Sequence, residues 1–201
     1  MSNSTTPEII DPAASALPAT PAHTRTRSLI TAALIAALMA TSSWIAGTGA
    51  VPITLQTFFV VFAAVVLRPR WAAASMALYV LLGIVGLPVF AGATAGPAVL
   101  AGPSGGYLIG FIVAAPLCSL IFHIDSDNRA IRIATSVIGI VASILLIDGL
   151  GTIWLAISLQ MGFFAAVAAG IVPFLVGDAL KALVAVLVGR YLARALWAGT
   201  R

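Results

Sequence analysis

The chain has 201 residues, of which 61% are apolar and only 8% are charged. Soluble domains carry roughly 25% charged residues, and ten basic and six acidic side chains are too few to cover a water-exposed surface, so a soluble fold is excluded. Disorder is excluded because a disordered chain needs low hydrophobicity and high net charge. A polytopic membrane protein is the class that remains. Its net charge of +4 is expected to set its orientation in the lipid bilayer and not to bind nucleic acid.

The first 27 residues differ in composition from the rest of the chain. They are rich in Ser, Thr, Ala and Pro, contain no aromatic residue, and end in Arg25 and Arg27. They predict a disordered cytoplasmic tail (1–27), followed by one membrane domain (28–201). A cleaved signal peptide is the alternative, with Thr48 and Ala50 resembling a cleavage site, but the polar leader is too long for one.

The arginines after the tail predict the number of membrane spans. They fall into three clusters: Arg68 and Arg70; Arg129 and Arg132; Arg190, Arg194 and Arg201. Each apolar interval has room for two helical spans of about 20 residues, and cytoplasmic loops carry the excess of arginine. The chain is therefore expected to cross the plasma membrane six times, as an all-α protein with both termini in the cytoplasm. The expected spans are residues 29–46, 52–67, 71–88, 106–123, 131–148 and 173–196.

Two of the outer connections are apolar. Residues 88–106 hold five glycines, three prolines and no charge, so they cannot remain helical. Irregular backbone at membrane depth is tolerated where it lines a cavity, which favours a lid over a pocket, the alternative being a plain Gly/Pro linker. Residues 149–172 form the second excursion and are expected to contain a short interfacial helix.

Asp178 and Lys181 are ionisable residues inside the sixth expected span. Their i, i+3 spacing places both on one helix face, and such a residue in a span costs at least about 2.5–3.5 kcal/mol and marks function by default. The pair predicts a pocket floor that offers an acceptor carboxylate and a donor ammonium to a small ligand with N–H and C=O groups. The alternative is a pair that only neutralises itself.

Other polar groups are candidates for the same pocket. Gln56 can donate and accept hydrogen bonds, or it can bridge two helices. Ser104 and Gly105 precede Tyr107 at the start of the fourth span, where free N–H groups and the helix dipole favour an anion. The alternative for Ser104 is a plain N-cap.

Four aromatic residues lie in the outer halves of spans or in outer connections: Trp44, Tyr79, Phe90 and Trp154. Aromatic side chains at this depth ordinarily form an interfacial belt. Some of them can instead form the wall of an apolar pocket.

Small residues follow one face of the first span. Ala32, Ala36 and Ala40 recur every four residues, with Ala33 and Ala37 beside them. Such small-xxx-small ridges allow the close approach of a second helix, so these five alanines are the candidate surface for a protein partner.

The sequence lacks the residues that several functional classes require. There is no Walker A sequence for ATP and no Cys/His cluster for a metal. Ser104 and His123 lie near opposite ends of one span, roughly 28 Å apart at 1.5 Å per residue. We therefore expect no catalytic residue, metal or cofactor. An intramembrane enzyme is disfavoured, as is a channel, which would need a ring of charges.

Five blocks of sequence together resemble the BioY family, the biotin-binding S components of energy-coupling-factor transporters. In order, the blocks are VPITLQTFFV, RPRW, LLGIVGLPVFAG, GPSGGYLIGF and PFLVGDALKAL, and the resemblance covers about residues 29–197. It implies a six-helix fold with an outward-facing biotin pocket, roofed by the first and third outer loops. It also implies uptake of biotin driven by a transmembrane coupling subunit and two cytoplasmic ATPases, with the small-residue face of the first helix toward that partner.

The resemblance also implies site residues. Asp178 and Lys181 match the charged pair of the family and should contact the ureido ring, while Gln56, Tyr79 and the loop 90–107 (Phe90, Ser104, Gly105 and Tyr107) match pocket-lining regions. The outer connections hold no Arg that could bind the valerate carboxylate of biotin. This carboxylate is expected either to contact the helix start at Ser104–Tyr107 or to remain solvated. The alternative functions are a solitary biotin transporter and an S component for another small vitamin.

Overall fold

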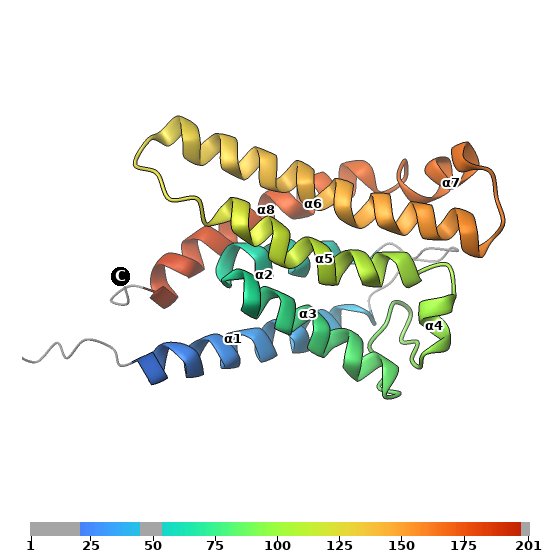
Figure 1. Ribbon diagram of the computed structural model, residues 1–201, viewed down its shortest axis with the longest axis horizontal. Helices are drawn as coiled ribbons and strands as arrows, with labels where there is room; N and C mark the ends of the chain where they lie inside the picture. Colours follow the sequence, from blue (N-terminus) through green and yellow to red (C-terminus); the bar gives the residue numbers. More distant parts are fainter. Residues whose placement is uncertain (1–20, 45–53, 198–201) are drawn as a thin grey trace, which may run out of the picture.

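The protein is all-helical in the part that its computed structural model describes, residues 21–44 and 54–197 (Figure 1). The helices are α1 (Pro21–Ser42), α2 (Gln56–Val66), α3 (Pro69–Ile84), α4 (Ala98–Ala101), α5 (Gly105–Phe122), α6 (Arg129–Ser158), α7 (Phe163–Gly170) and α8 (Leu175–Trp197). Six of them match the six expected spans in order. The two short helices, α4 and α7, lie in the two apolar outer connections.

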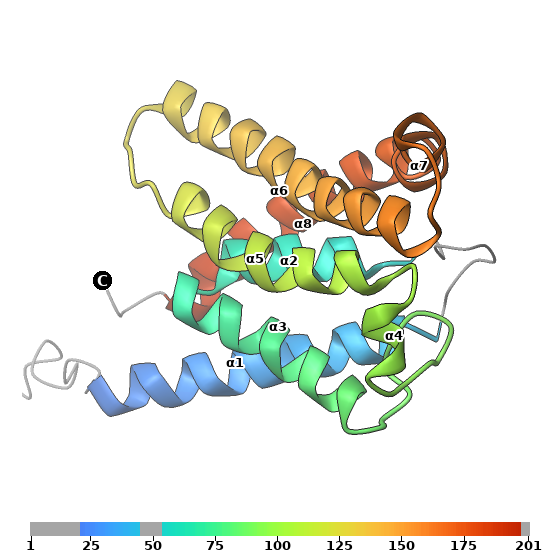
Figure 2. The same cartoon turned by 45° about the vertical axis from the view of Figure 1, so that its right-hand side comes forward.

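The six longer helices run side by side, with α4 and α7 together at one end of the molecule, here called the loop end (Figures 1 and 2). The start of α1, the α2–α3 junction, the α5–α6 connection and the end of α8 meet at the opposite end. These four segments carry every arginine of the described residues. The fold therefore collects the positive charge at one end, here called the arginine end.

Helix α2 is the centre of the bundle. It contacts α1, α3, α5, α6 and α8, and eight of its eleven residues are buried. Side chains from α2 to its C-cap form much of the core, including Val60, Val61 and Leu67. An apolar helix that is buried on all sides is hydrophobic all round, as the run FFVVFAAVV is.

Two helix boundaries differ from the expectation by more than four residues. Helix α1 begins at Pro21, so residues 21–27 are helical and do not belong to the tail; proline at a first helical position costs no hydrogen bond. Helix α6 continues beyond residue 148 to Ser158, because the run from 149 to 158 contains no proline or charge that would end it. Residues 1–20 of the expected tail (1–27) and the cleavage site of the disfavoured alternative (Thr48, Ala50) lie outside the described residues.

Within the described residues, α5 and α6 are each long and apolar enough to cross a membrane. Helices α7 and α8 meet at a bend of 49° and make a third span if they are taken as one. Helix α2 has only eleven residues, about 16 Å at 1.5 Å per residue, whereas the hydrocarbon core of a bilayer is about 30 Å thick. The count of six crossings therefore stays a prediction.

The outer surface of the bundle is apolar. Helix α6 exposes Ile133, Val137 and Leu145, and α8 exposes Leu180 and Leu187. A soluble protein rarely exposes large apolar patches of this kind. These side chains face lipid, as the composition requires of an integral membrane protein.

Candidate ligand-binding cavity

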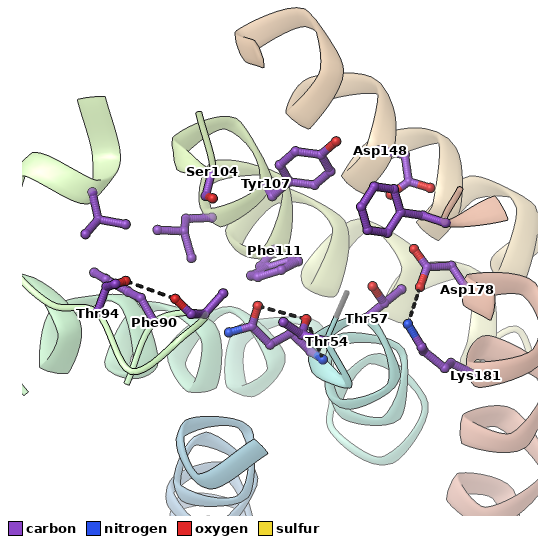
Figure 3. A pocket seen from close by; sticks show the side chains of 15 residues that line it. Thr54, Thr57, Phe90, Thr94, Ser104, Tyr107, Phe111, Asp148, Asp178 and Lys181 are labelled. Atoms are coloured by element: carbon purple, nitrogen blue, oxygen red, sulfur yellow. Dashed lines mark hydrogen bonds and ion pairs between the residues drawn. The ribbon is translucent and has the colours of Figure 1, made fainter. Parts of the chain in front are cut away.

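A cavity lies among α2, α5, α6 and α8, and residues 85–104 cover one side of it (Figure 3). It encloses about 580 Å³, with the open solvent at its mouth included. Its walls are formed by Thr54, Gln56, Thr57, Phe90, Ala91, Thr94, Val99, Ser104, Tyr107, Leu108, Phe111, Asp148, Phe174, Asp178 and Lys181. Six of the eight expected ligand-binding residues are among them; Tyr79 and Gly105 are not.

Asp178 and Lys181 form an ion pair in the cavity wall. The Lys181 Nζ lies 2.8 Å from Asp178 Oδ1. Asp178 is 3% exposed and lies in the first turn of α8, where the helix dipole stabilises a negative charge. Gly177 lies beside the ammonium, where a Cβ would make an ordinary van der Waals contact 3.9 Å from Lys181 Nζ. The pair thus offers a carboxylate and an ammonium side by side.

Asp148 is a second buried carboxylate in the cavity, and our sequence reasoning missed it. It projects from α6 and is 3% exposed. Its Oδ2 has no hydrogen-bond partner among the described residues. Asp148 is the last residue of an expected span (131–148), and no role was predicted for it. The rule that singled out Asp178, an ionisable residue in a long apolar run, identifies Asp148 equally well.

Gln56 lines the cavity with its amide already bonded inside the protein. Its Nε2 donates to the Tyr79 hydroxyl, and its Oε1 accepts from Thr54 Oγ1 at 3.2 Å. Tyr79 in turn donates to the Val89 carbonyl at 2.9 Å. Tyr79 is fully buried behind the cavity wall, where it positions Gln56 and residue 89. Gln56 therefore has both expected features: it lines the cavity and it bridges α2 to α3.

Residues 85–104 fold over the cavity as one unit, here called the 85–104 loop, which includes α4. Phe90 and Thr94 pair through two backbone hydrogen bonds. Gly92 between them takes a positive φ of 71°, a conformation that glycine adopts without strain. The Phe90 ring stacks edge-on against Tyr79 and packs on Gly83. Phe90 is thus held as a wall of the cavity and does not belong to an aromatic belt.

Two tryptophans fasten this loop to the bundle. Trp44 Nε1 donates to the Pro88 carbonyl at 3.1 Å, and Trp154 Nε1 donates to the Gly102 carbonyl at 3.0 Å. At the first attachment, the Gly92 N–H also donates to the Ser43 carbonyl. The loop is therefore joined to the end of α1 on one side and to α6 on the other.

The start of α5 presents Ser104 and Tyr107 to the cavity. Ser104 is the N-cap of α5 but its side chain makes no capping hydrogen bond, so the plain N-cap alternative is wrong. Tyr107 lines the cavity with its ring, while its hydroxyl donates to the Gly170 carbonyl at 2.8 Å. Gly105 packs away from the cavity, against the Leu100 carbonyl and the Trp154 indole.

The cavity has two chemically different sides. Figure 3 places Asp148, Asp178 and Lys181 on one side, and Ser104 and Thr94 on the other, with the Phe111 ring between them. Charged groups thus face neutral hydroxyls across an aromatic wall. The arrangement suits a small, elongated ligand with hydrogen-bonding groups at one end and an apolar middle.

Comparison with known proteins assigns this chain to a family. The family model described as "BioY family" matches residues 14–198. The chain belongs to the BioY family. This confirms the resemblance seen in the five sequence blocks.

Other BioY-family proteins match over most of their length. The biotin transporter BioY2 of Lactococcus lactis is 39% identical over 175 residues, which are 87% of this chain and 94% of that protein. The biotin transporter BioY of Thermotoga maritima is 38% identical over 168 residues, 81% of this chain and 93% of its own. A probable biotin transporter BioY of Pyrococcus horikoshii is 40% identical over 144 residues, 72% of this chain and 82% of its own.

A solved structure confirms the fold. It is described as the S-component for biotin from an ECF-type ABC transporter, and it is similar with a TM-score of 0.78 and 26% identity. The match covers 88% of this chain and 95% of that one. The all-helical S-component fold expected for a BioY-family chain is therefore the fold observed.

The five alanines expected to face a partner in this BioY-family chain divide into two sets. Ala32 and Ala36 are buried, and the Ala32 carbonyl accepts a hydrogen bond from Ser75 of α3 at 2.8 Å. Ala33 and Ala37 are exposed, and Ala40 is half-buried against the core. The expectation is corrected for Ala32 and Ala36, because packing inside the chain already uses that ridge. The exposed small residues are Ala33 and Ala37.

Proposed function

We propose that the chain is the biotin-binding S component of an energy-coupling-factor transporter and mediates biotin uptake across the plasma membrane. The observation that carries the proposal is the buried Asp178–Lys181 pair in the wall of the cavity, in a chain of the BioY family. Biotin carries a cyclic urea with two N–H donors and one C=O acceptor. A carboxylate and an ammonium side by side complement one N–H and the C=O with charge-assisted hydrogen bonds.

The two sides of the cavity support one orientation of biotin. The ureido ring lies toward Asp178 and Lys181, and the valerate chain extends past Phe111 toward Ser104 and Thr94. Phe111 and Phe174 supply apolar contact for the bicyclic ring and the chain. The Ser104 hydroxyl, which does not cap α5, is then a donor for the valerate carboxylate.

ATP hydrolysis is supplied by other proteins in this proposal. The chain has no Walker A sequence, so two cytoplasmic ATPases act through a transmembrane coupling subunit. The exposed strip around Ala33 and Ala37 on α1 is the docking face for that subunit, because small side chains let a second helix approach closely. The arginine end faces the cytoplasm, and the cavity opens toward the outside.

Equilibrium binding of radiolabelled biotin to the purified chain in detergent tests the proposal. Saturable binding that unlabelled biotin displaces, and that other small vitamins do not, is the expected result. Absence of saturable biotin binding would overturn the assignment, and displacement by another vitamin would reassign the ligand.

Reconstitution into vesicles tests the energy source. Uptake of biotin by the chain alone is compared with uptake by a complex that contains the coupling subunit and ATPases, with and without ATP. We expect uptake that requires both the partners and ATP. Equal uptake by the chain alone would identify it as a solitary transporter.

A further inference from the structure

Asp148 is a buried carboxylate of the cavity whose chemistry the proposed function leaves unused. It lies on α6, across the cavity wall from α8, and Figure 3 places its carboxylate on the same side of the cavity as Asp178 and Lys181. It is 3% exposed, and its Oδ2 has no hydrogen-bond partner in the described part of the chain. A buried acceptor without a donor destabilises a protein, so such a group needs an explanation.

Several neighbouring donors are already engaged. Lys181 Nζ is 2.8 Å from Asp178 Oδ1, the Gln56 amide N–H donates to Tyr79, and the Tyr107 hydroxyl donates to the Gly170 carbonyl. The cavity wall therefore holds two buried carboxylates and one ammonium, and that ammonium is bound to the other carboxylate. The Thr152 hydroxyl, one turn further along α6, is also unpaired but does not line the cavity. The occupant of the cavity is therefore a source of a donor on the cavity side of Asp148.

The proposed ligand has such a donor. The two N–H groups of a cyclic urea point to opposite flanks of its C=O. Asp178 and Lys181, which neighbour each other on α8, account for one N–H and the C=O. The second N–H then points away from α8.

We propose that Asp148 accepts the second ureido N–H of biotin, so that carboxylates on α6 and α8 hold the ring from both flanks. This inference rests on the proposed function. It assigns Asp148 a role in specificity: the cavity selects a ring with two N–H donors over a ring with one. A cyclic carbamate, in which oxygen replaces one N–H, would bring a lone pair against a carboxylate.

The test measures the affinities of the full chain for biotin and for its two isomeric carbamate analogues, each lacking a different ureido N–H. The variant is Asp148→Asn, which keeps the shape of the side chain. The matched control is Asp127→Asn, in the exposed α5–α6 connection. The loss of one hydrogen bond to a charged group predicts about ten- to hundredfold weaker biotin binding for Asp148→Asn and no change for Asp127→Asn.

The carbamate analogues distinguish a direct contact from damage to the fold. The side-chain amide of the Asp148→Asn variant can donate to a ring oxygen, so this variant should recover binding of one isomer relative to biotin and leave the ratio for the other isomer unchanged. Because both ligands are measured on one preparation, the ratio does not depend on the folded fraction.

Two results would overturn the inference while leaving the proposed function intact. One is wild-type affinity for biotin in Asp148→Asn. The other is a loss by the same factor for biotin and both analogues, which would make Asp148 a structural residue. Wild-type protein that binds no biotin would instead overturn the proposed function itself, before any variant is compared.

Discussion

At the scale of single residues, the buried ion pair of α8 has two separable roles. Asp178 and Lys181 neutralise each other at 2.8 Å, which lowers the cost of placing either charge in a membrane protein. The same two groups face the cavity. Removing one partner strands the other charge, whereas removing both strands neither. Comparing single with double variants therefore separates stability from ligand binding.

The first prediction concerns that comparison. Asp178→Asn and Lys181→Met should each weaken biotin binding about ten- to hundredfold, because each loses a charge-assisted hydrogen bond of roughly 1.5–3 kcal/mol. The double variant should fold and still bind weakly. Biotin titration together with thermal unfolding of all three variants is the measurement. A folded double variant that binds biotin like the parent would mean that the pair does not contact the ligand.

At the scale of helices, the α5–α6 contact positions the cavity. These two helices form the most extensive contact between elements of the bundle, and they approach closely at Gly106. A Cβ on Gly106 would lie 2.2 Å from the Trp154 Cβ and 2.6 Å from the Leu150 carbonyl oxygen. The backbone atom cannot move aside as a flexible side chain would. Glycine at this position therefore sets the separation between Tyr107 on α5 and Asp148 on α6.

The second prediction uses two glycines of this region. Gly106→Ala should destabilise the protein by about 1–3 kcal/mol through overpacking and weaken ligand binding by moving α5 away from α6. Gly149→Ala is the matched control, since a Cβ there meets nothing within 4 Å and alanine favours helix by up to about 1 kcal/mol. Thermal unfolding in detergent compares them. Equal stability of the two variants would contradict the close contact.

The third prediction concerns the two faces of α1. Leu at Ala33 and Ala37 should leave biotin binding by the isolated chain intact and reduce uptake by the assembled transporter, where about 1.4 kcal/mol lost in association is tenfold in affinity. Leu at Ala32 and Ala36 should instead damage the isolated chain, because both are buried in the chain itself. Binding and uptake measured side by side distinguish the two pairs. Unchanged uptake in the first pair would exclude that strip as the docking face.

At the scale of the whole molecule, the arrangement of charge predicts topology. Every arginine of the described residues belongs to the arginine end, and the cavity with its loop lies toward the opposite end (Figures 1 and 2). The excess of arginine marks the cytoplasmic side of a membrane protein. The cavity is then presented to the outside of the cell.

The fourth prediction tests this orientation. In a Cys118→Ala background, a cysteine at Ala98 in α4 should react with an impermeant thiol reagent in intact cells, and a cysteine at Asp127 should react only after the membrane is opened. Both positions are exposed, whereas the native Cys118 is buried. The reverse labelling pattern would invert the topology.

The order of helices was predictable because arginine spacing and helix length constrain it. The end of α6 was not, since neither charge nor proline marks Ser158 and a helix inside lipid needs no polar terminus. Asp178 and Lys181 stood out as charges within an apolar run, and the structure places both in the cavity wall. Asp148 escaped notice because the span that contained it was drawn too short. Burial of Ala32 and exposure of Ala33 depend on where α3 packs, which one helix does not determine.

The two indole hydrogen bonds that join the 85–104 loop to the bundle allow intrinsic tryptophan fluorescence to report on ligand binding under the loop. Trp44 and Trp154 lie at the two attachments of this loop. Trp71 stacks with Arg70, and Trp197 donates to the Val66 carbonyl, both at the arginine end. Binding of biotin under the loop should therefore change the intrinsic fluorescence of the chain through Trp44 and Trp154. The fluorescence change should persist when Trp71 and Trp197 are replaced by Phe, and Trp154→Phe should remove a large part of it. A fluorescence change carried by Trp71 or Trp197 would instead place the effect of biotin at the arginine end. Emission from these two indoles would then time the arrival of biotin under the loop without any added dye.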